Sequence, residues 1–154
     1  MLKRKSLQIL LLILILAAFL RLWRIDQVPV SLFGDERDGG YQAYSILKTG
    51  RDYSGNFTPI HFRSFAEWRT PLYLYSSVPT VALFGISPLG VRLPAALFEI
   101  LGVWLFYLLI KVFTKKENLA LLSAFLLTIS PWHIQYSRAG FEATQMLALY
   151  LAGI

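Results

Sequence analysis

The feature that most constrains this chain is an apolar run from Leu93 to Ile110, LPAALFEILGVWLFYLLI, in which Glu99 is the one charged residue. As a helix, its eighteen residues would be about 27 Å long, close to the thickness of the hydrocarbon core of a bilayer. The whole chain is 56% hydrophobic and 16% charged, which is too apolar for an ordinary soluble domain. The run therefore predicts a membrane-spanning helix.

Two further apolar runs have the same character. The first lies between a basic cluster at residues 3–5 and about residue 24, and no A-x-A cleavage site follows it, so we interpret it as an uncleaved first span. The other extends from Leu119 to Tyr136, where Pro131 should bend its far end. Both runs are expected to cross the membrane.

A fourth apolar run opens near Phe141 and reaches Ile154, and its fourteen residues are too few to cross a bilayer. We therefore expect residues 1–154 to be the amino-terminal part of a single transmembrane domain, cut inside a helix, poorly stable and inactive alone. The expected fold is all-α and integral to the membrane, with three transmembrane helices at about 7–24, 92–112 and 118–136 and a truncated fourth from 141.

Segment 71–85, PLYLYSSVPTVALFG, decides the predicted topology. It is apolar but short, and Pro79 and a pair of serines interrupt it. If it crossed the membrane, the lysine-rich turn at 111–116 would lie outside, whereas an interfacial segment leaves that turn in the cytoplasm, as the positive-inside rule prefers. We therefore expect residues 25–91 to form one long extracytoplasmic loop of amphipathic surface helices. The N-terminus should be cytoplasmic, in the plasma (inner) membrane.

The net charge of +6 is a topology signal in this reading, because the cations gather at the ends of the apolar runs and not along one soluble face. We therefore expect no nucleic-acid partner. The chain has no cysteine, which excludes disulfides and thiolate metal sites.

Several polar residues lie in or near the predicted spans. Arg21 and Arg24 have long stems that can carry their charges to the interface. A charge at Glu99 is costly, so we expect it to have a partner in helices beyond this chain, or to be protonated. His61 and His133 lack a close carboxylate pattern, so we assign them ordinary interfacial hydrogen bonds and propose no metal ligand.

Residues 34–50, GDERDGGYQAYSILKTG, predict a short surface helix within the external loop. We expect Asp35 to cap its start and Gly50 to end it. Tyr41, Tyr44 and Leu47 recur at three-residue intervals and should share one face, which suits a helix that lies on the membrane surface.

Two acidic sites fall on the same side of the membrane in this topology. Asp35 and Glu36 follow the first span, and Glu142 lies in the turn after the third. A carboxylate near the bilayer surface can act as general base toward an acceptor hydroxyl, while a nearby arginine neutralises a phosphate leaving group. The candidate arginines are Arg63, Arg69 and Arg138.

Taken in order, these features resemble the membrane glycosyltransferases of the GT-C fold, such as the protein O-mannosyltransferases and the lipid A aminoarabinose transferases. The resemblance runs from Arg21 to the last residue. The motifs that carry it are RLW at the end of the first span, GDE before a helix that ends in LKTG, a PLY segment, FGISPLGVRLPAALF leading into the second span, and SPWHIQYSRAGFEA after the third.

The resemblance implies transfer of a sugar, with inversion, from a polyprenyl-phosphate carrier to an acceptor hydroxyl on a protein, lipid or glycan at the extracytoplasmic face. By position, Asp35 matches the catalytic acid, Glu36 an acidic neighbour that helps to hold the acceptor, and Glu142 a second acid. The phosphate- or substrate-binding residues implied are Arg69, Arg138, Tyr41 and Tyr44. Membrane lipid is a further partner. No nucleotide is needed at this step, and a divalent metal is left open.

The sequence departs from the best-known members at three places: it has Glu at position 142, Asp38-Gly39-Gly40 ahead of Tyr41, and Glu99 inside a span. Two other functions stay open. Three complete spans are few to enclose a carrier site, which favours a non-enzymatic scaffold or assembly subunit. A lipid-linked sugar flippase should carry polar residues along several spans, and these are sparse here apart from Glu99.

Overall fold

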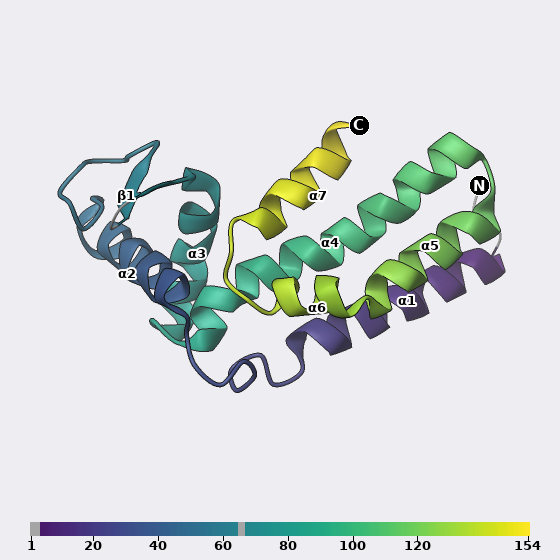
Figure 1. Cartoon of the computed structure of the whole chain (residues 1–154), viewed down its shortest axis with the longest axis horizontal. Coiled ribbons are helices and arrows are strands. Elements are labelled where there is room, and N and C mark those ends of the chain that lie inside the picture. The colour runs from purple at the N-terminus through teal and green to yellow at the C-terminus, as the bar shows by residue number, and fades with distance from the viewer. Residues whose placement is uncertain (1–3, 65–66) are drawn as a thin grey trace.

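The computed structural model describes residues 4–64 and 67–154. These residues are mostly helical, with one short two-stranded antiparallel sheet. Figure 1 shows α1, α4, α5 and α7 as a bundle of elongated helices, and α2, α3 and the hairpin as a second group at one end of it. In chain order the elements are α1 (Arg4–Leu22), α2 (Gly34–Thr49), β1 (Phe62–Ser64), β2 (Glu67–Arg69), α3 (Pro71–Phe84), α4 (Pro88–Thr114), α5 (Glu117–Ile129), α6 (Pro131–Ser137) and α7 (Ala143–Gly153).

Two of the described helices, α1 with 19 residues and α4 with 27, are long and apolar enough to cross a membrane. A third candidate is the pair α5 and α6, which meet at a bend of 61°. Pro131 is the first residue of α6, so the bend lies where the sequence predicts it. The mostly helical membrane class is confirmed, whereas the number of spans stays a prediction because it depends on whether the bent pair is one span.

Small apolar residues contribute to the close packing of α1, α4 and α5. Ala17 of α1, Val103 of α4, and Ala120 and Ala124 of α5 are buried in one cluster. Because lipid is as apolar as the helices, membrane helices associate by close packing, which small side chains permit. The outer faces carry exposed large apolar side chains, which suits contact with lipid.

A buried polar cluster joins three elements of the bundle. Nη2 of Arg21 lies 2.6 Å from Nδ1 of His133, and Nε2 of His133 lies 2.6 Å from Oε2 of Glu99. All three side chains are almost completely buried. Glu99 therefore has a partner within the chain, His133, whereas the sequence analysis expected one in helices beyond it. Arg21 does not carry its charge to the interface, and His133 is not an interfacial side chain.

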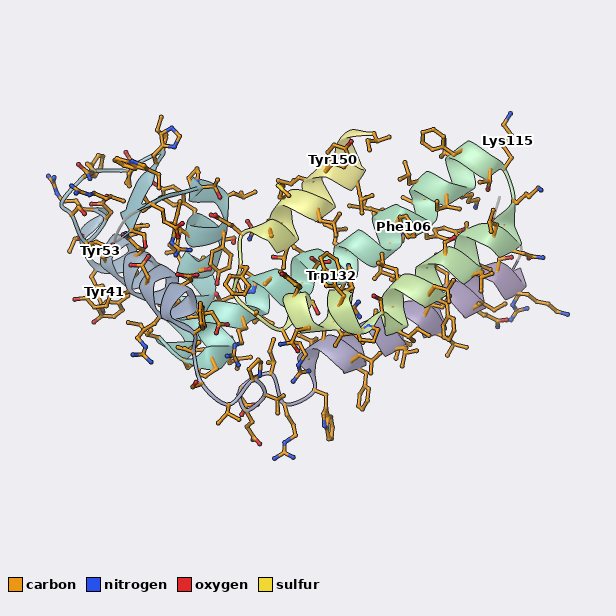
Figure 2. The ribbon with its side chains drawn as sticks, in the orientation of Figure 1. Tyr41, Tyr53, Phe106, Lys115, Trp132 and Tyr150 are labelled. Atoms are coloured by element: carbon orange, nitrogen blue, oxygen red, sulfur yellow. The ribbon has the colours of Figure 1, made fainter. Side chains whose placement is uncertain are left out.

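The start of α1 and the lysine-rich turn lie at the same end of the bundle. Figure 1 places the start of α1 beside the turn between α4 and α5, and Figure 2 shows Lys115 in that turn, at the far end from Tyr41 and Tyr53. Lys111 pairs with Glu117 across the turn at 3.0 Å. The lysine-rich turn and the N-terminal end of α1 thus share one side of the bundle.

Helix α2 spans the residues that the sequence predicts, with one difference at its start. Gly50 ends it in the left-handed conformation with φ 68°, as expected. Phe33 is the N-cap, and Oε2 of Glu36 accepts its backbone N–H at 2.8 Å. The prediction that Asp35 caps the helix is therefore wrong. Glu36 does so because the third helical residue can reach back to the N-cap.

A glycine pair lets α2 pack tightly against the start of α4. A β-carbon added at Gly40 would lie 2.8 Å from Cγ2 of Val91, too close for any side chain. Gly39 faces Tyr73 and Leu74 of α3 at ordinary contact distance or slightly less. The pair therefore brings the acidic first turn of α2 close to α3 and α4, at the cost of weaker helix propensity.

The external segment also contains a β-hairpin. Strands β1 and β2 pair antiparallel with Phe62 opposite Arg69, and Phe62 is fully buried. The all-α expectation did not include this hairpin, because three-residue strands are too short to show a period in the sequence. Segment 71–84 is helical, as α3, and its fourteen residues leave it outside the candidate spans.

Candidate active site

Asp35 and Arg69 form an ion pair at the centre of the candidate site. Asp35 lies in the first turn of α2, Arg69 ends β2, and Nη2 of Arg69 donates to Oδ1 of Asp35 at 2.6 Å. The Asp35 side chain is 37% exposed, whereas the Arg69 side chain is 11% exposed. The pair thus presents a carboxylate to solvent beside a cation that is held in place.

Two further acids surround the Arg69 guanidinium. Nη2 also donates to Oε1 of Glu67 at 3.0 Å, and Nε lies 3.4 Å from Oδ2 of Asp38. Among contacts between described residues, neither Nη1 of Arg69 nor Oδ2 of Asp35 has a hydrogen-bond partner. Among the described residues, the site therefore combines a donor group and a carboxylate oxygen that no other protein group binds.

Glu142 reaches the residue next to Arg69. It precedes α7, and its Oε2 accepts hydrogen bonds from the backbone N–H of Thr70 at 3.1 Å and from the Thr70 hydroxyl at 2.8 Å. Asp35 and Glu142, far apart in the sequence, are thus held by the consecutive residues Arg69 and Thr70. The structure brings the two sequence-predicted acidic sites together.

Glu36 is buried behind this surface. Its Oε1 accepts from Nε of Arg92 at 2.7 Å and from the backbone N–H of Gly140 at 2.8 Å, while Oε2 accepts from Phe33 and from Nη2 of Arg92. Burial by itself would raise the pKa of Glu36, but the hydrogen bonds from Arg92, Phe33 and Gly140 outweigh it and lower that pKa. Glu36 is thus an anion that ties α2, α4 and the turn before Glu142 to one another.

Arg92 is a site residue that the sequence analysis missed. It is fully buried in the first turns of α4 and, besides Glu36, donates to the carbonyls of Ile25, Pro29 and Ser31. It therefore fixes the chain between α1 and α2. The sequence could have pointed to Arg92, because it is a lone arginine at the start of a predicted span, in VRLP. A cation there needs an anionic or carbonyl partner.

Arg138 caps the end of α1. Its guanidinium donates to the carbonyls of Leu20 at 2.9 Å and Val28 at 2.9 Å, with longer bonds to those of Arg21 and Arg24. Burial lowers the pKa of Arg138, with a smaller effect from Arg92. Its hydrogen bonds within the chain are therefore to α1 and the loop after it.

Comparison with known proteins shows the family of this chain. The sequence model of the family described as dolichyl-phosphate-mannose-protein mannosyltransferase matches residues 69–153. The chain belongs to this family. The resemblance to GT-C membrane glycosyltransferases is thereby confirmed. Neither the curated proteins nor the solved structures include a match to this chain.

The mannosyltransferase-family match begins at Arg69 and ends in α7. It covers Arg69, Thr70, Arg92 and Glu142, which hold the site together. The first turn of α2, which carries Asp35, lies before the matched region and joins it through the Arg69 ion pair.

The two predicted tyrosines have different surroundings. Tyr41 is 56% exposed, and its ring centroid lies 6.3 Å from that of Tyr53. Tyr44 is 39% exposed and lies below the ammonium of Lys48, at 5.7 Å. Tyr41 borders an open groove beside the site, whereas the Tyr44 contact points along α2 toward its C-terminal end.

The sequence predicts no metal ligand and leaves a divalent metal open. Within residues 4–64 and 67–154, no group of three or more His, Asp or Glu side chains is arranged to hold a metal ion. The acids around Asp35 converge instead on the guanidinium of Arg69. That arrangement makes an arginine the central cation of the site among the described residues.

Proposed function

We propose that this chain carries the acceptor-activating site of a glycosyltransferase that uses a polyprenyl-phosphate sugar as donor. The observation that supports this most is the convergence of Asp35 and Glu142 on the consecutive residues Arg69 and Thr70. A carboxylate oxygen next to a guanidinium donor matches the two needs of the reaction, a base for the acceptor hydroxyl and a cation for the phosphate.

In the proposed step, Oδ2 of Asp35 accepts the proton of an acceptor hydroxyl as its oxygen attacks the anomeric carbon. The bond between that carbon and the phosphate oxygen breaks, and the lipid phosphate leaves with the bonding electron pair. Attack from the face opposite to the leaving group inverts the anomeric centre. Nη1 of Arg69 faces the phosphate, while Nη2 keeps Asp35 in position.

Glu36 and Glu142 act through their neighbours in this proposal. Glu36 makes its hydrogen bonds inside the protein and holds the turns that carry the other two acids. Glu142 fixes Thr70 and thereby the backbone that carries Arg69. We therefore assign both as positioning residues, in place of the direct acceptor contact that the resemblance implied for Glu36.

We further propose that α2, the hairpin and α3 lie at the extracytoplasmic surface, with the N-terminus and the lysine-rich turn in the cytoplasm. That the start of α1 and the lysine-rich turn lie at the same end of the bundle supports this orientation. The membrane would be the plasma (inner) membrane of a cell envelope. The acceptor hydroxyl would belong to a protein, lipid or glycan on the outer side.

A substitution of Asp35 tests the proposal. Asp35→Asn, made in the complete gene, keeps the size and the hydrogen bond to Arg69 but removes the base. We expect transfer of sugar from a polyprenyl-phosphate donor to fall by about a hundredfold or more. The matched control is Asp26→Asn, which changes an exposed acid between α1 and α2 and should leave transfer unchanged. Transfer within twofold of the unsubstituted protein in the Asp35 variant, roughly 0.4 kcal/mol, would remove Asp35 as base.

A further inference from the structure

A groove lies beside the ion pair of Asp35 and Arg69. It has a volume of about 820 Å³ and is open to solvent. Figure 2 shows Tyr41 and Tyr53 next to each other, at the end of the molecule away from Lys115. The lining includes Arg37, Asp38 and Tyr41 of α2, and Tyr53, Ser54 and Arg63 from the following segment and β1.

Two exposed arginines, Arg37 and Arg63, line the groove, and their surroundings differ from those of the arginines already described. Arg69, Arg92 and Arg138 donate to acids or carbonyls of the protein. Among contacts between described residues, the guanidiniums of Arg37 and Arg63 have no hydrogen-bond or ion-pair partner. A guanidinium presents paired N–H donors that match phosphate and carboxylate groups. The groove therefore has two guanidiniums that no other described residue binds and that could bind an anion.

The tyrosines give the groove a second kind of contact. Tyr41 is 56% exposed and Tyr53 is 39% exposed, and both line the groove, so aromatic surface is open to it. The Tyr53 hydroxyl is fixed by a bond of 2.9 Å to the carbonyl of Arg63. A flat or ring-shaped apolar surface, such as one face of a pyranose, packs well against such rings.

A single residue connects the groove with the candidate site. Asp38 lines the groove, and its Oδ2 lies 3.4 Å from Nε of Arg69, which holds Asp35. A ligand bound by the groove would thus lie beside the proposed base. The polyprenyl chain of a donor must stay in the hydrocarbon, whereas Tyr41 and Tyr53, which line the groove, lie at the end of the molecule opposite Lys115 (Figure 2). An acceptor that arrives from water fits this position better than the donor does.

We propose that the groove binds the acceptor, and that the acceptor is a saccharide bearing a phosphate or carboxylate group. Arg37 and Arg63 bind the anionic group, and Tyr41 and Tyr53 pack against the sugar ring. The ligand's role as acceptor rests on the proposed function, but its binding to the groove can be measured without sugar transfer.

The experiment measures binding by isothermal titration calorimetry, with the protein from the complete gene in an uncharged detergent. The probes are glucose 6-phosphate, glucuronate and glucose, which share a ring and differ in charge. We expect at least one charged sugar to bind about tenfold or more tightly than glucose, and added salt to weaken it. Comparison of the two charged probes distinguishes a phosphate from a carboxylate.

Substitutions locate the site. Arg37→Gln and Arg63→Gln should each weaken binding of the charged sugar by about tenfold. Lys48→Gln is the matched control, because it removes one cation from the same helix outside the groove lining, and it should leave binding unchanged. Arg37→Lys keeps the charge but loses the paired donors. If it weakens binding of the charged sugar less than Arg37→Gln does, the loss reflects recognition of the anion and not misfolding.

Two further probes test other occupants. If decyl phosphate binds through Arg37 and Arg63 and the charged sugars do not, the groove is a lipid-phosphate site and the inference is wrong. If hexaglutamate alone binds through them, the acceptor is an acidic protein and the inference is equally wrong. Equal binding of glucose and its charged analogues would also overturn it.

Asp35→Asn keeps the two proposals apart, because Asp35 lies outside the groove lining. Loss of transfer with intact binding of the charged sugar supports both. Loss of transfer in a protein that binds no charged sugar overturns the groove assignment alone. Full transfer by the variant overturns the proposed function, whatever the groove binds.

Discussion

Glu36 and Arg92 form a two-point ion pair in the interior, with Nε 2.7 Å from Oε1 and Nη2 3.1 Å from Oε2. The Glu36 side chain is 2% exposed and that of Arg92 is 0% exposed. The same carboxylate accepts the backbone N–H of Gly140, two residues before Glu142. The pair therefore connects the turn that carries Asp35 with the turn that carries Glu142, so the site depends on a contact in the protein interior.

Removing the charge of Glu36 should destabilise the protein strongly. Glu36→Gln leaves Arg92 as a buried cation without its anion, and such changes cost about 3–5 kcal/mol of unfolding free energy. Thermal unfolding of the detergent-solubilised protein measures the loss. Glu67→Gln serves as the control, because that side chain is 65% exposed and its removal should change stability little. Adding Arg92→Met to the Glu36→Gln variant should restore part of the lost unfolding free energy. If the losses of the two single variants simply add in the double variant, the two side chains do not interact.

The lowered pKa of Glu36 predicts a pH dependence of stability. The ordinary pKa of this carboxyl is 4.5, and in the folded protein it is lower. The unfolded chain therefore binds the proton first as pH falls, so the stabilisation is present above the ordinary pKa and is lost as pH falls through the folded one. We expect the unfolding free energy to decrease between about pH 5 and about pH 3, and Glu36→Gln to decrease less over that range. Equal slopes for the two proteins would contradict the assignment to Glu36.

Much of the fold could be predicted because its signals are local. The apolar runs that became α1 and α4, the bend at Pro131 and the end of α2 at Gly50 each depend on a few neighbouring residues. The prediction that Asp35 and Glu142 lie on the same side of the membrane followed from the number of expected membrane-spanning helices between them. That they would share consecutive partners, Arg69 and Thr70, could not be derived from either segment alone.

What the sequence did not indicate depends on contacts between distant segments. Nothing near Glu99 shows that His133 will approach it, and nothing near Glu36 shows that Arg92 will bury it. Of two adjacent acids, the local pattern favoured Asp35 as the helix cap, but Glu36 has the longer side chain and the position that reaches the N-cap. Such choices are settled by packing, which a single sequence does not display.

Arg138 should matter for stability more than for donor affinity. Its guanidinium donates to carbonyls at the end of α1 and in the following loop, and Arg138→Met removes those donors from a partly buried site. We expect a loss of about 2–3 kcal/mol, because a hydrogen bond to a charged group contributes about that much. Arg24→Met is the control, since Arg24 is exposed and bonds to Gln27. A large rise in the KM for the donor with unchanged thermal stability would instead favour the phosphate-binding role.

Thr70 provides the most direct test of how Glu142 contributes. Thr70→Val keeps the shape of the side chain and the backbone N–H to Glu142 but removes the hydroxyl donor at 2.8 Å. One neutral donor to a carboxylate is worth about 1.5 kcal/mol, so we expect kcat for sugar transfer to fall about tenfold. KM should change little because Thr70 acts through the placement of Arg69, and Thr70→Ser, which keeps the hydroxyl, should restore kcat. If Thr70→Ser is as slow as Thr70→Val, the methyl group and not the hydroxyl is what matters, and the hydroxyl bond to Glu142 has no positioning role.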